Sequence, residues 1–264
     1  MATAGVLKCP PAVPGSSHVM RNGAQMSLTA QSRVVVVGGT SGIGLAVAHA
    51  VSKRGAAVVI GSRSAKSVDK ALGELPGARG TQVDVTDPAS LNSFFAEAGE
   101  FDHLVYTAGD DIVRAPIADY SPEKAHAFFE VRVFRAFDTV RAALSTLRPT
   151  GSITLTSGAG AYLGGPGRLL SAAVGGSLIS AGQSLAAELA PIRVNVIVPG
   201  IVRTPLYASM PQQAREEMFT HASSHTLVGR AAEPEEIAES YVHLMEADYV
   251  TGTVSLVEGG LLRT

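Results

Sequence analysis

The feature that most constrains the fold of this chain is a glycine-rich turn that directly follows a short apolar run. Arg33–Val37 (RVVVV) is almost entirely β-branched, which is typical of a strand buried on both faces of a parallel sheet. Residues 37–44 (VGGTSGIG) then lead into an amphipathic helical pattern between Leu45 and Val51. Glycines at such a turn let the backbone approach a pyrophosphate, whose charge the N-terminal amides of the helix attract. The sequence therefore predicts a dinucleotide-binding turn, with a glycine-rich surface loop as the alternative.

Strand-like and helix-like segments alternate along the rest of the chain. The segments that predict further strands are residues 56–61, 80–85, 101–106, 151–156, 192–198 and 251–257. This alternation predicts an α/β fold of Rossmann type, a doubly wound parallel sheet of about seven strands with helices on both faces. The chain is 46% apolar, enough for one large core. Residues 32–264 are therefore expected to form a single domain, preceded by a flexible N-terminal extension of residues 1–31.

Charge and cysteine content argue against several partners and locations. A net charge of −2 gives no reason to expect binding to nucleic acid or to an anionic membrane surface. Cys9 is the only cysteine, so an internal disulfide is excluded, which fits a reducing compartment. The first residues contain several prolines and no continuous apolar stretch, so no secretory signal is expected. A cytoplasmic location is predicted; a cleaved organelle peptide is the alternative, because this segment has no acidic residue.

Residues 169–187 form a long stretch without a charged side chain. Its length is compatible with a membrane span. Its glycines, its serines and Gln183 instead favour a helix buried against a partner subunit. No membrane association is predicted.

Five motifs follow the order and spacing of one enzyme family. Residues 37–44 match a TGxxxGxG turn, with valine in place of the threonine, residues 84–85 match an adenine-contacting Asp-Val pair, and residues 107–109 match the tail of NNAG. Residues 199–205 (PGIVRTP) resemble a PG motif with a nicotinamide-contacting threonine, and residues 257–260 (VEGG) resemble a closing DGG segment. From its first predicted strand to the C-terminus, the chain resembles a short-chain dehydrogenase/reductase. The resemblance implies a small-molecule substrate and a homodimer or homotetramer.

The end of the second predicted strand indicates which nucleotide binds. Where an NAD enzyme presents a carboxylate to the ribose, this chain has Ser62 followed by Arg63. A guanidinium clamps a 2′-phosphate that a carboxylate would repel, so NADP(H) is the predicted cofactor. The alternative is that Arg63 is a solvated loop cation. The predicted cofactor-binding residues are Gly38, Thr40, Ser41, Gly42, Ile43, Gly44, Ser62, Arg63, Asp84, Val85, Ala108, Gly109, Pro199, Gly200, Val202 and Thr204.

The catalytic residues that the resemblance implies are missing. The family uses an Asn, a Ser, a Tyr and a Lys, the Tyr acting as general acid or base with a pKa lowered by the Lys. Aligned on the flanking segments, these four positions hold Arg132, Gly158, Ser171 and Gly175. A register shifted by one residue offers Ser157, Leu170 and Val174 for the last three. A positioned general acid is worth on the order of 100- to 10,000-fold in rate, so ordinary ketone reduction is predicted to be severely slowed.

Four other side chains are predicted to carry the chemistry. Asp110 and Asp111 follow the turn at residues 107–109 and would stabilise an iminium ion, which hydride converts into a neutral amine without a proton donor. Arg132 would polarise a carbonyl or bind a carboxylate. Tyr162 is the candidate acid, with an apolar pocket wall as the alternative.

No metal site is predicted. His221 and His225 are four residues apart, a spacing that lets them share a helix face. A third ligand is missing nearby, and a zinc site needs at least three protein ligands.

Three functions fit this sequence. The first is an NADP(H)-dependent oxidoreductase with a non-standard active site that reduces an iminium ion or another activated small molecule. The second is a non-redox cyclase, because the resemblance extends to fungal reductase/Diels-Alderases of indole-alkaloid biosynthesis, which lack the Tyr and Lys and use an Arg with acidic groups. The third is a catalytically inactive NADP-binding homologue. An adaptable, methionine-containing lid is predicted over residues 206–229.

Overall fold

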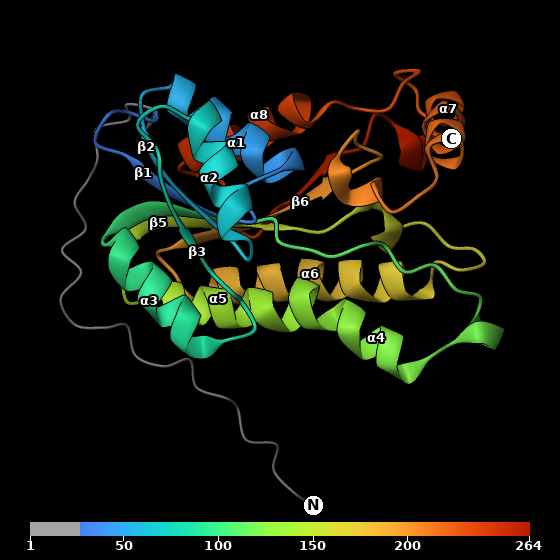
Figure 1. The fold of residues 1–264 in the computed structure, drawn as a ribbon, viewed down its shortest axis with the longest axis horizontal. Helices are drawn as coiled ribbons and strands as arrows, with labels where there is room; N and C mark the ends of the chain where they lie inside the picture. The colour runs from blue at the N-terminus through green and yellow to red at the C-terminus, as the bar shows by residue number, and fades with distance from the viewer. Residues whose placement is uncertain (1–26) are drawn as a thin grey trace, which may run out of the picture.

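A computed structural model describes residues 27–264 and contains one seven-stranded sheet. All six strand pairs are parallel, and the strand order is β3-β2-β1-β4-β5-β6-β7 (Figure 1). The strands are β1 (Arg33–Val37), β2 (Ala57–Ser62), β3 (Arg79–Gln82), β4 (Phe101–Tyr106), β5 (Leu147–Thr156), β6 (Arg193–Pro199) and β7 (Val254–Val257). The predicted Rossmann-type sheet is confirmed, and β1 and β4 match their predicted bounds.

Two strands are shorter than predicted for local reasons. β3 ends before Asp84, because its carboxylate accepts hydrogen bonds from the amide and the hydroxyl of Thr86 at 2.9 and 2.7 Å. This tight turn takes the chain away from the sheet edge. β7 begins after Gly252, whose φ of 67° is incompatible with an extended strand.

Helices cover both faces of the sheet (Figure 1). They are α1 (Gly42–Lys53), α2 (Ala65–Glu74), α3 (Pro88–Ala98), α4 (Pro122–Phe129), α5 (Arg135–Ala143), α6 (Leu169–Glu188), α7 (Gln212–Ser224) and α8 (Pro234–Glu246). One apolar core joins the sheet to α3, α4, α5 and α6, and a second joins it to α1, α2 and α8. A third, small cluster lies apart from both and involves α7.

The start of the predicted domain can be refined. Leu28 is buried in the second core, and its amide donates to Glu246 Oε1 at 3.0 Å. Packing therefore begins inside the segment 1–31 that was expected to be flexible. Residues 1–26, with Cys9, lie outside the described residues.

The apolar helix α6 packs on β6 and α4. Within the described residues, it is the one helix long and apolar enough to cross a membrane, judged by length and composition only. Gly182 brings it close to the sheet, because a Cβ there would overlap the side chain of Val196. Only 28% of its most apolar window is buried. A large part of α6 is thus available to a partner, and burial against a second subunit stays a prediction.

Candidate active site

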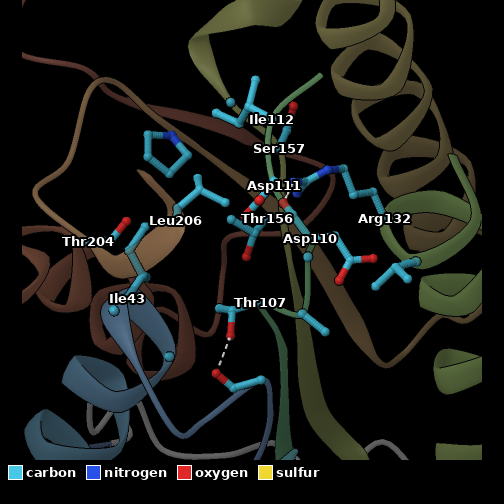
Figure 2. Close-up of a pocket in the computed structure, with 18 of the residues that line it drawn as sticks. Ile43, Thr107, Asp110, Asp111, Ile112, Arg132, Thr156, Ser157, Thr204 and Leu206 are labelled. Carbon is cyan, nitrogen blue, oxygen red and sulfur yellow. Dashed lines mark hydrogen bonds between the residues drawn. The ribbon is translucent and has the colours of Figure 1, made fainter. Parts of the chain in front are cut away.

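A cleft of about 740 Å³ opens at the carboxyl ends of the strands. β1 lies between β2 and β4, so the strand order changes direction here, which is where open α/β sheets bind ligands. Every predicted cofactor-binding residue lines this cleft. Figure 2 shows the cleft between the segment that carries Thr204 and Leu206 on one side and Arg132 on the other.

The glycine turn forms a bare cradle under the cleft. Gly38 and Gly42 have φ values of 89° and 51°, which only glycine adopts easily. A Cβ at Gly38 would lie 2.6 Å from the amide nitrogen of Ala108, and one at Gly44 would overlap the Gly38 carbonyl oxygen. The first turn of α1 has no acidic residue, and no side chain caps its amides. The free amides, and the space left because the glycines have no side chain, fit a bound pyrophosphate.

The adenosine end of the cleft is formed by Ser62, Arg63 and Asp84. The Arg63 side chain is 74% exposed, and its Nη2 lies 3.8 Å from Asp110 Oδ1. Hydrogen bonds from the Thr86 amide and hydroxyl hold the pKa of Asp84 below its usual range. An exposed guanidinium at this end fits the 2′-phosphate of NADP(H).

Arg132 reaches the cleft from a π-helical turn, η2 (Glu130–Phe134), that joins α4 to α5. Its Nη2 donates to the Asp110 carbonyl oxygen, and its guanidinium carbon lies 4.6 Å from the centre of the Phe128 ring. Burial lowers the pKa of Arg132, and the nearby charge of Asp110 opposes this shift. Its buried Nε finds no hydrogen-bond partner within residues 27–264. A buried, incompletely satisfied guanidinium is a strong donor for a ligand acceptor atom.

Two neighbours hold Arg132 in place. Tyr106, at the end of β4, donates its hydroxyl to the Val131 carbonyl oxygen at 2.5 Å and so supports the wide turn. Gly109 leaves room for the guanidinium, because a Cβ there would overlap Nη1 of Arg132. Asp110 and Asp111 also line the cleft, close to the end of the Arg132 side chain (Figure 2). The structure therefore brings the predicted Arg132, Asp110 and Asp111 together.

The positions predicted for the family's Tyr and Lys hold small residues in close contact. Ser157, Gly158, Ser171 and Gly175 all line the cleft. Ser157 Oγ donates to the Gly175 carbonyl oxygen at 3.0 Å, and a Cβ at Gly175 would lie 2.8 Å from the Ala161 Cβ. A larger residue at Gly175 therefore requires the segment that carries Ala161 to move away from α6.

The prediction that Tyr162 lies in the cleft as a candidate acid is wrong. The 3₁₀ turn η3 (Ala159–Ala161) ends with the Tyr162 amide bonded to the Ala159 carbonyl oxygen, and the side chain is 49% exposed. Tyr162 does not line the cleft.

The tyrosine that does line the cleft is Tyr207, on η4 (Pro205–Tyr207), with 6% exposure. Sequence reasoning missed it, although it stands only three residues after Thr204 of the PG motif.

His221 of α7 and His225, the residue that follows this helix, lie side by side outside the cleft with an angle of 41° between their rings. The ring centres of His221 and His225 are 4.1 Å apart, and His225 Nδ1 lies 2.8 Å from the His221 carbonyl oxygen. In the part of the chain that the structure describes, no three His, Cys, Asp or Glu side chains gather as a metal site. Absence of a metal stays a prediction.

Known proteins resemble this chain over most of its length. Residues 37–262 match the family model described as enoyl-(acyl carrier protein) reductase. The short-chain dehydrogenase/reductase malC of Malbranchea aurantiaca is 32% identical over 87% of this chain and 94% of its own. The short-chain dehydrogenase/reductase ucsE of an Acremonium species is 33% identical, with the same coverage.

Solved structures give the same result. The MalC reductase/Diels-Alderase of Malbranchea aurantiaca superimposes with a TM-score of 0.82 at 29% identity, covering 88% of this chain and 97% of that one. A small-chain dehydrogenase in complex with NADPH superimposes with a TM-score of 0.78 at 31% identity, covering 88% and 99%. The fold, the motifs at the cleft and these relatives together show that the chain belongs to the short-chain dehydrogenase/reductase family.

Proposed function

We propose that this protein is an NADP(H)-dependent oxidoreductase that reduces an iminium ion or another activated small molecule in a non-standard active site. The observation that carries the proposal is the meeting of Arg132, Asp110 and Asp111 in a cleft whose Tyr and Lys positions hold Ser171 and Gly175. Support for the cofactor comes from the glycine cradle, from Arg63 and from the NADPH complex of a relative. NADPH, when bound, supplies a hydride.

The chain's own residues have complementary tasks in this proposal. The carboxylates of Asp110 and Asp111 stabilise the positive charge of an iminium substrate. Arg132, whose side chain lines the cleft, uses its guanidinium to hold an acceptor oxygen of the same substrate, such as a carbonyl or carboxylate. Because Arg132 already donates to the Asp110 carbonyl, the cation-binding and anion-binding groups have a fixed relative position. The favoured substrate therefore carries both an electrophilic cation and an acceptor oxygen.

The first experiment titrates the protein with NADPH and with NADH, following nicotinamide fluorescence and thermal unfolding. NADPH at 100 times its Kd is expected to raise the Tm by roughly 5–10 °C, because ligand at that excess stabilises by about 2.7 kcal/mol. Arg63→Ala is expected to weaken NADPH binding on the order of 10- to 100-fold and to leave NADH binding unchanged.

Arg141 provides a matched control for Arg63. Its side chain is also 74% exposed and also lies 3.8 Å from a carboxylate, that of Asp138, but it does not line the cleft. Arg141→Ala should bind both nucleotides as the wild type does. Equal loss in the two variants, or equal NADPH and NADH affinities in the wild type, would refute the role of Arg63.

A second candidate function is a cyclase in which the nucleotide is structural. It is favoured by the similarity to the reductase/Diels-Alderase MalC and by the guanidinium of Arg132, which polarises an acceptor oxygen without redox chemistry. The test is product formation from a diene–dienophile substrate with NADP⁺ in place of NADPH. Turnover that requires NADPH and consumes it contradicts the cyclase.

Assembly and location complete the proposal. We expect a homodimer or homotetramer in the cytoplasm, supported by the low burial of the apolar helix α6 in a single chain. Light scattering of the purified protein measures the assembly. A monomer at micromolar concentration contradicts it.

A further inference from the structure

We infer that Tyr207 is the proton donor of the cleft and extends its substrates from iminium ions to carbonyl compounds. The inference rests on the proposed reductase function. Tyr207 is the last residue of η4. Its amide donates a hydrogen bond to the carbonyl oxygen of Thr204, the residue predicted to contact the nicotinamide. It is 94% buried by packing, and yet it lines the cleft. A phenol is thus present at the end of the cleft where Thr204 would contact the nicotinamide of a bound NADPH.

The ring of Tyr207 is held by apolar contacts. It meets the ring of Phe219 edge-on, with centres 5.7 Å apart and an interplanar angle of 89°. Together with Ala231, these two residues form the small third cluster, covered by partly buried residues that include Ile112 and Leu206. Packing on the carbon edges leaves the hydroxyl as the one group of Tyr207 available to a substrate.

The hydroxyl of Tyr207 is free to act. It makes no hydrogen bond within residues 27–264, and it is absent from the enclosed unpartnered atoms, which are Arg132 Nε and Thr154 Oγ1. The hydroxyl is therefore neither hydrogen-bonded nor fully enclosed, and it belongs to a side chain that lines the cleft. Since buried polar groups normally have a partner, an open phenol in a largely buried side chain indicates a ligand atom at this point.

Charges around Tyr207 suit the loss of a proton to a substrate. Burial raises the pKa of Tyr207, so that the phenol is protonated before reaction. Arg114 and Arg132, which both line the cleft, act in the opposite direction and stabilise the phenolate that proton donation creates. A donor with a high pKa still protonates an alkoxide, whose conjugate acid is far weaker.

Other groups in the cleft are less suited to this task. No lysine, histidine or cysteine from residues 27–264 lines it. The arginine side chains do not act as proton donors, because they stay protonated in proteins. The Asp84 carboxylate already accepts hydrogen bonds from Thr86. In the proposed function, the carboxylates of Asp110 and Asp111 stabilise the positive charge of the substrate. Serine and threonine hydroxyls also line the cleft but are weaker acids than a phenol, so Tyr207 is the most acidic remaining hydroxyl of the described cleft.

The reaction balances with a ketone as substrate. The carbonyl carbon gains a hydride supplied by NADPH, and the C=O π pair moves to the oxygen. That oxygen takes the proton of Tyr207 as the phenolic O–H bond breaks. The products are an alcohol, NADP⁺ and a phenolate, which regains a proton from water. An iminium carbon accepts the same hydride and becomes part of a neutral amine, so this reduction leaves Tyr207 unused.

The test compares two probes of similar shape, the N-methyl dihydroisoquinolinium cation and the ketone β-tetralone, with NADPH consumption as the readout. Tyr207→Phe removes only the hydroxyl. It is expected to lower kcat for the ketone on the order of 100- to 10,000-fold and to change iminium reduction by less than about twofold. Tyr120→Phe, in an exposed tyrosine outside the cleft, is the control and should change neither rate.

Each other outcome overturns the inference. If the wild type reduces the iminium probe but not the ketone, or if Tyr207→Phe keeps the ketone rate, Tyr207 is not the donor, while the proposed reductase stands. If Tyr207→Phe loses both reactions equally but keeps NADPH-induced stabilisation, Tyr207 only supports packing. If the wild type binds NADPH but reduces neither probe, the inference fails, while the proposed function is decided by a substrate that carries both a cation and an acceptor oxygen.

Discussion

At the scale of single residues, the pair Gly109 and Arg132 decides whether the cleft has a positioned guanidinium. A methyl group at Gly109 would overlap Arg132 Nη1, so Gly109→Ala should displace the side chain. We expect Arg132→Ala and Gly109→Ala each to reduce turnover at least about tenfold, with NADPH affinity retained in Arg132→Ala. The double variant should be no worse than Arg132→Ala, because the two changes remove one interaction.

Gly73→Ala is the control for the added methyl group. A Cβ at Gly73 meets nothing within 4 Å, so this change in α2 should leave turnover as it is. The measurement is kcat with a reducible probe, together with the Kd for NADPH. If Arg132→Ala leaves both turnover and nucleotide binding unchanged, Arg132 has no role in the reaction.

The two tyrosines show where sequence reasoning reached its limit at this scale. The cofactor residues were predictable because glycine, proline and threonine stand at fixed spacings in recognisable motifs. The position of Tyr162, in a glycine-rich loop after β5, predicts a cleft residue, but the turn η3 places its side chain at the surface. Tyr207 lies in a segment without periodicity, and its burial depends on Phe219 from α7. Such a contact between distant segments leaves no local pattern.

At the scale of elements, a buried histidine links β4 to β5. His103 Nδ1 lies 2.9 Å from Ser152 Oγ, and burial lowers the pKa of His103 from 6.5 to about 4. Between pH 6.5 and about pH 4, His103 is protonated in the unfolded chain but stays neutral in the folded protein. Stability is therefore lost as the pH falls below 6.5, by ~3 kcal/mol at pH 4.

Denaturant unfolding at several pH values checks this prediction. In His103→Gln, which has no titrating ring, the fall in unfolding free energy between pH 7 and pH 4 should be smaller by ~3 kcal/mol than in the wild type. A variant with the same pH dependence as the wild type would show that His103 titrates normally in the fold.

Elements differ in how well their sequence predicts them. The strands β1 and β4 are almost wholly buried at the centre of the sheet, and their bounds matched. The bounds of β3 depend on a side-chain turn at Asp84, and the wide turn η2 depends on Tyr106 bonding the Val131 carbonyl oxygen. Both are interactions of single polar groups, which hydrophobic periodicity does not report.

At the scale of the whole molecule, the three apolar clusters predict unequal local stability. α8 buries six residues against the sheet, including Tyr241, whereas α7 buries only Phe219 and Ala222. We expect the α7 amides to exchange hydrogen faster than those of α8. A ligand that fills the cleft should slow exchange in α7 through Tyr207 and leave α8 unchanged. Equal exchange in both helices, measured by mass spectrometry, would contradict this.

The π-helical turn at residues 130–134 makes the cleft depend on the length of the chain as well as on its composition. An α-helix rotates by about 100° per residue, so the extra residue of a π turn shifts the direction of every side chain on one side of it. Removing one residue here would restore a regular helix and turn a different side chain toward the nucleotide end. A single codon gained or lost in this stretch would thus redirect side chains of the cleft without altering the sheet.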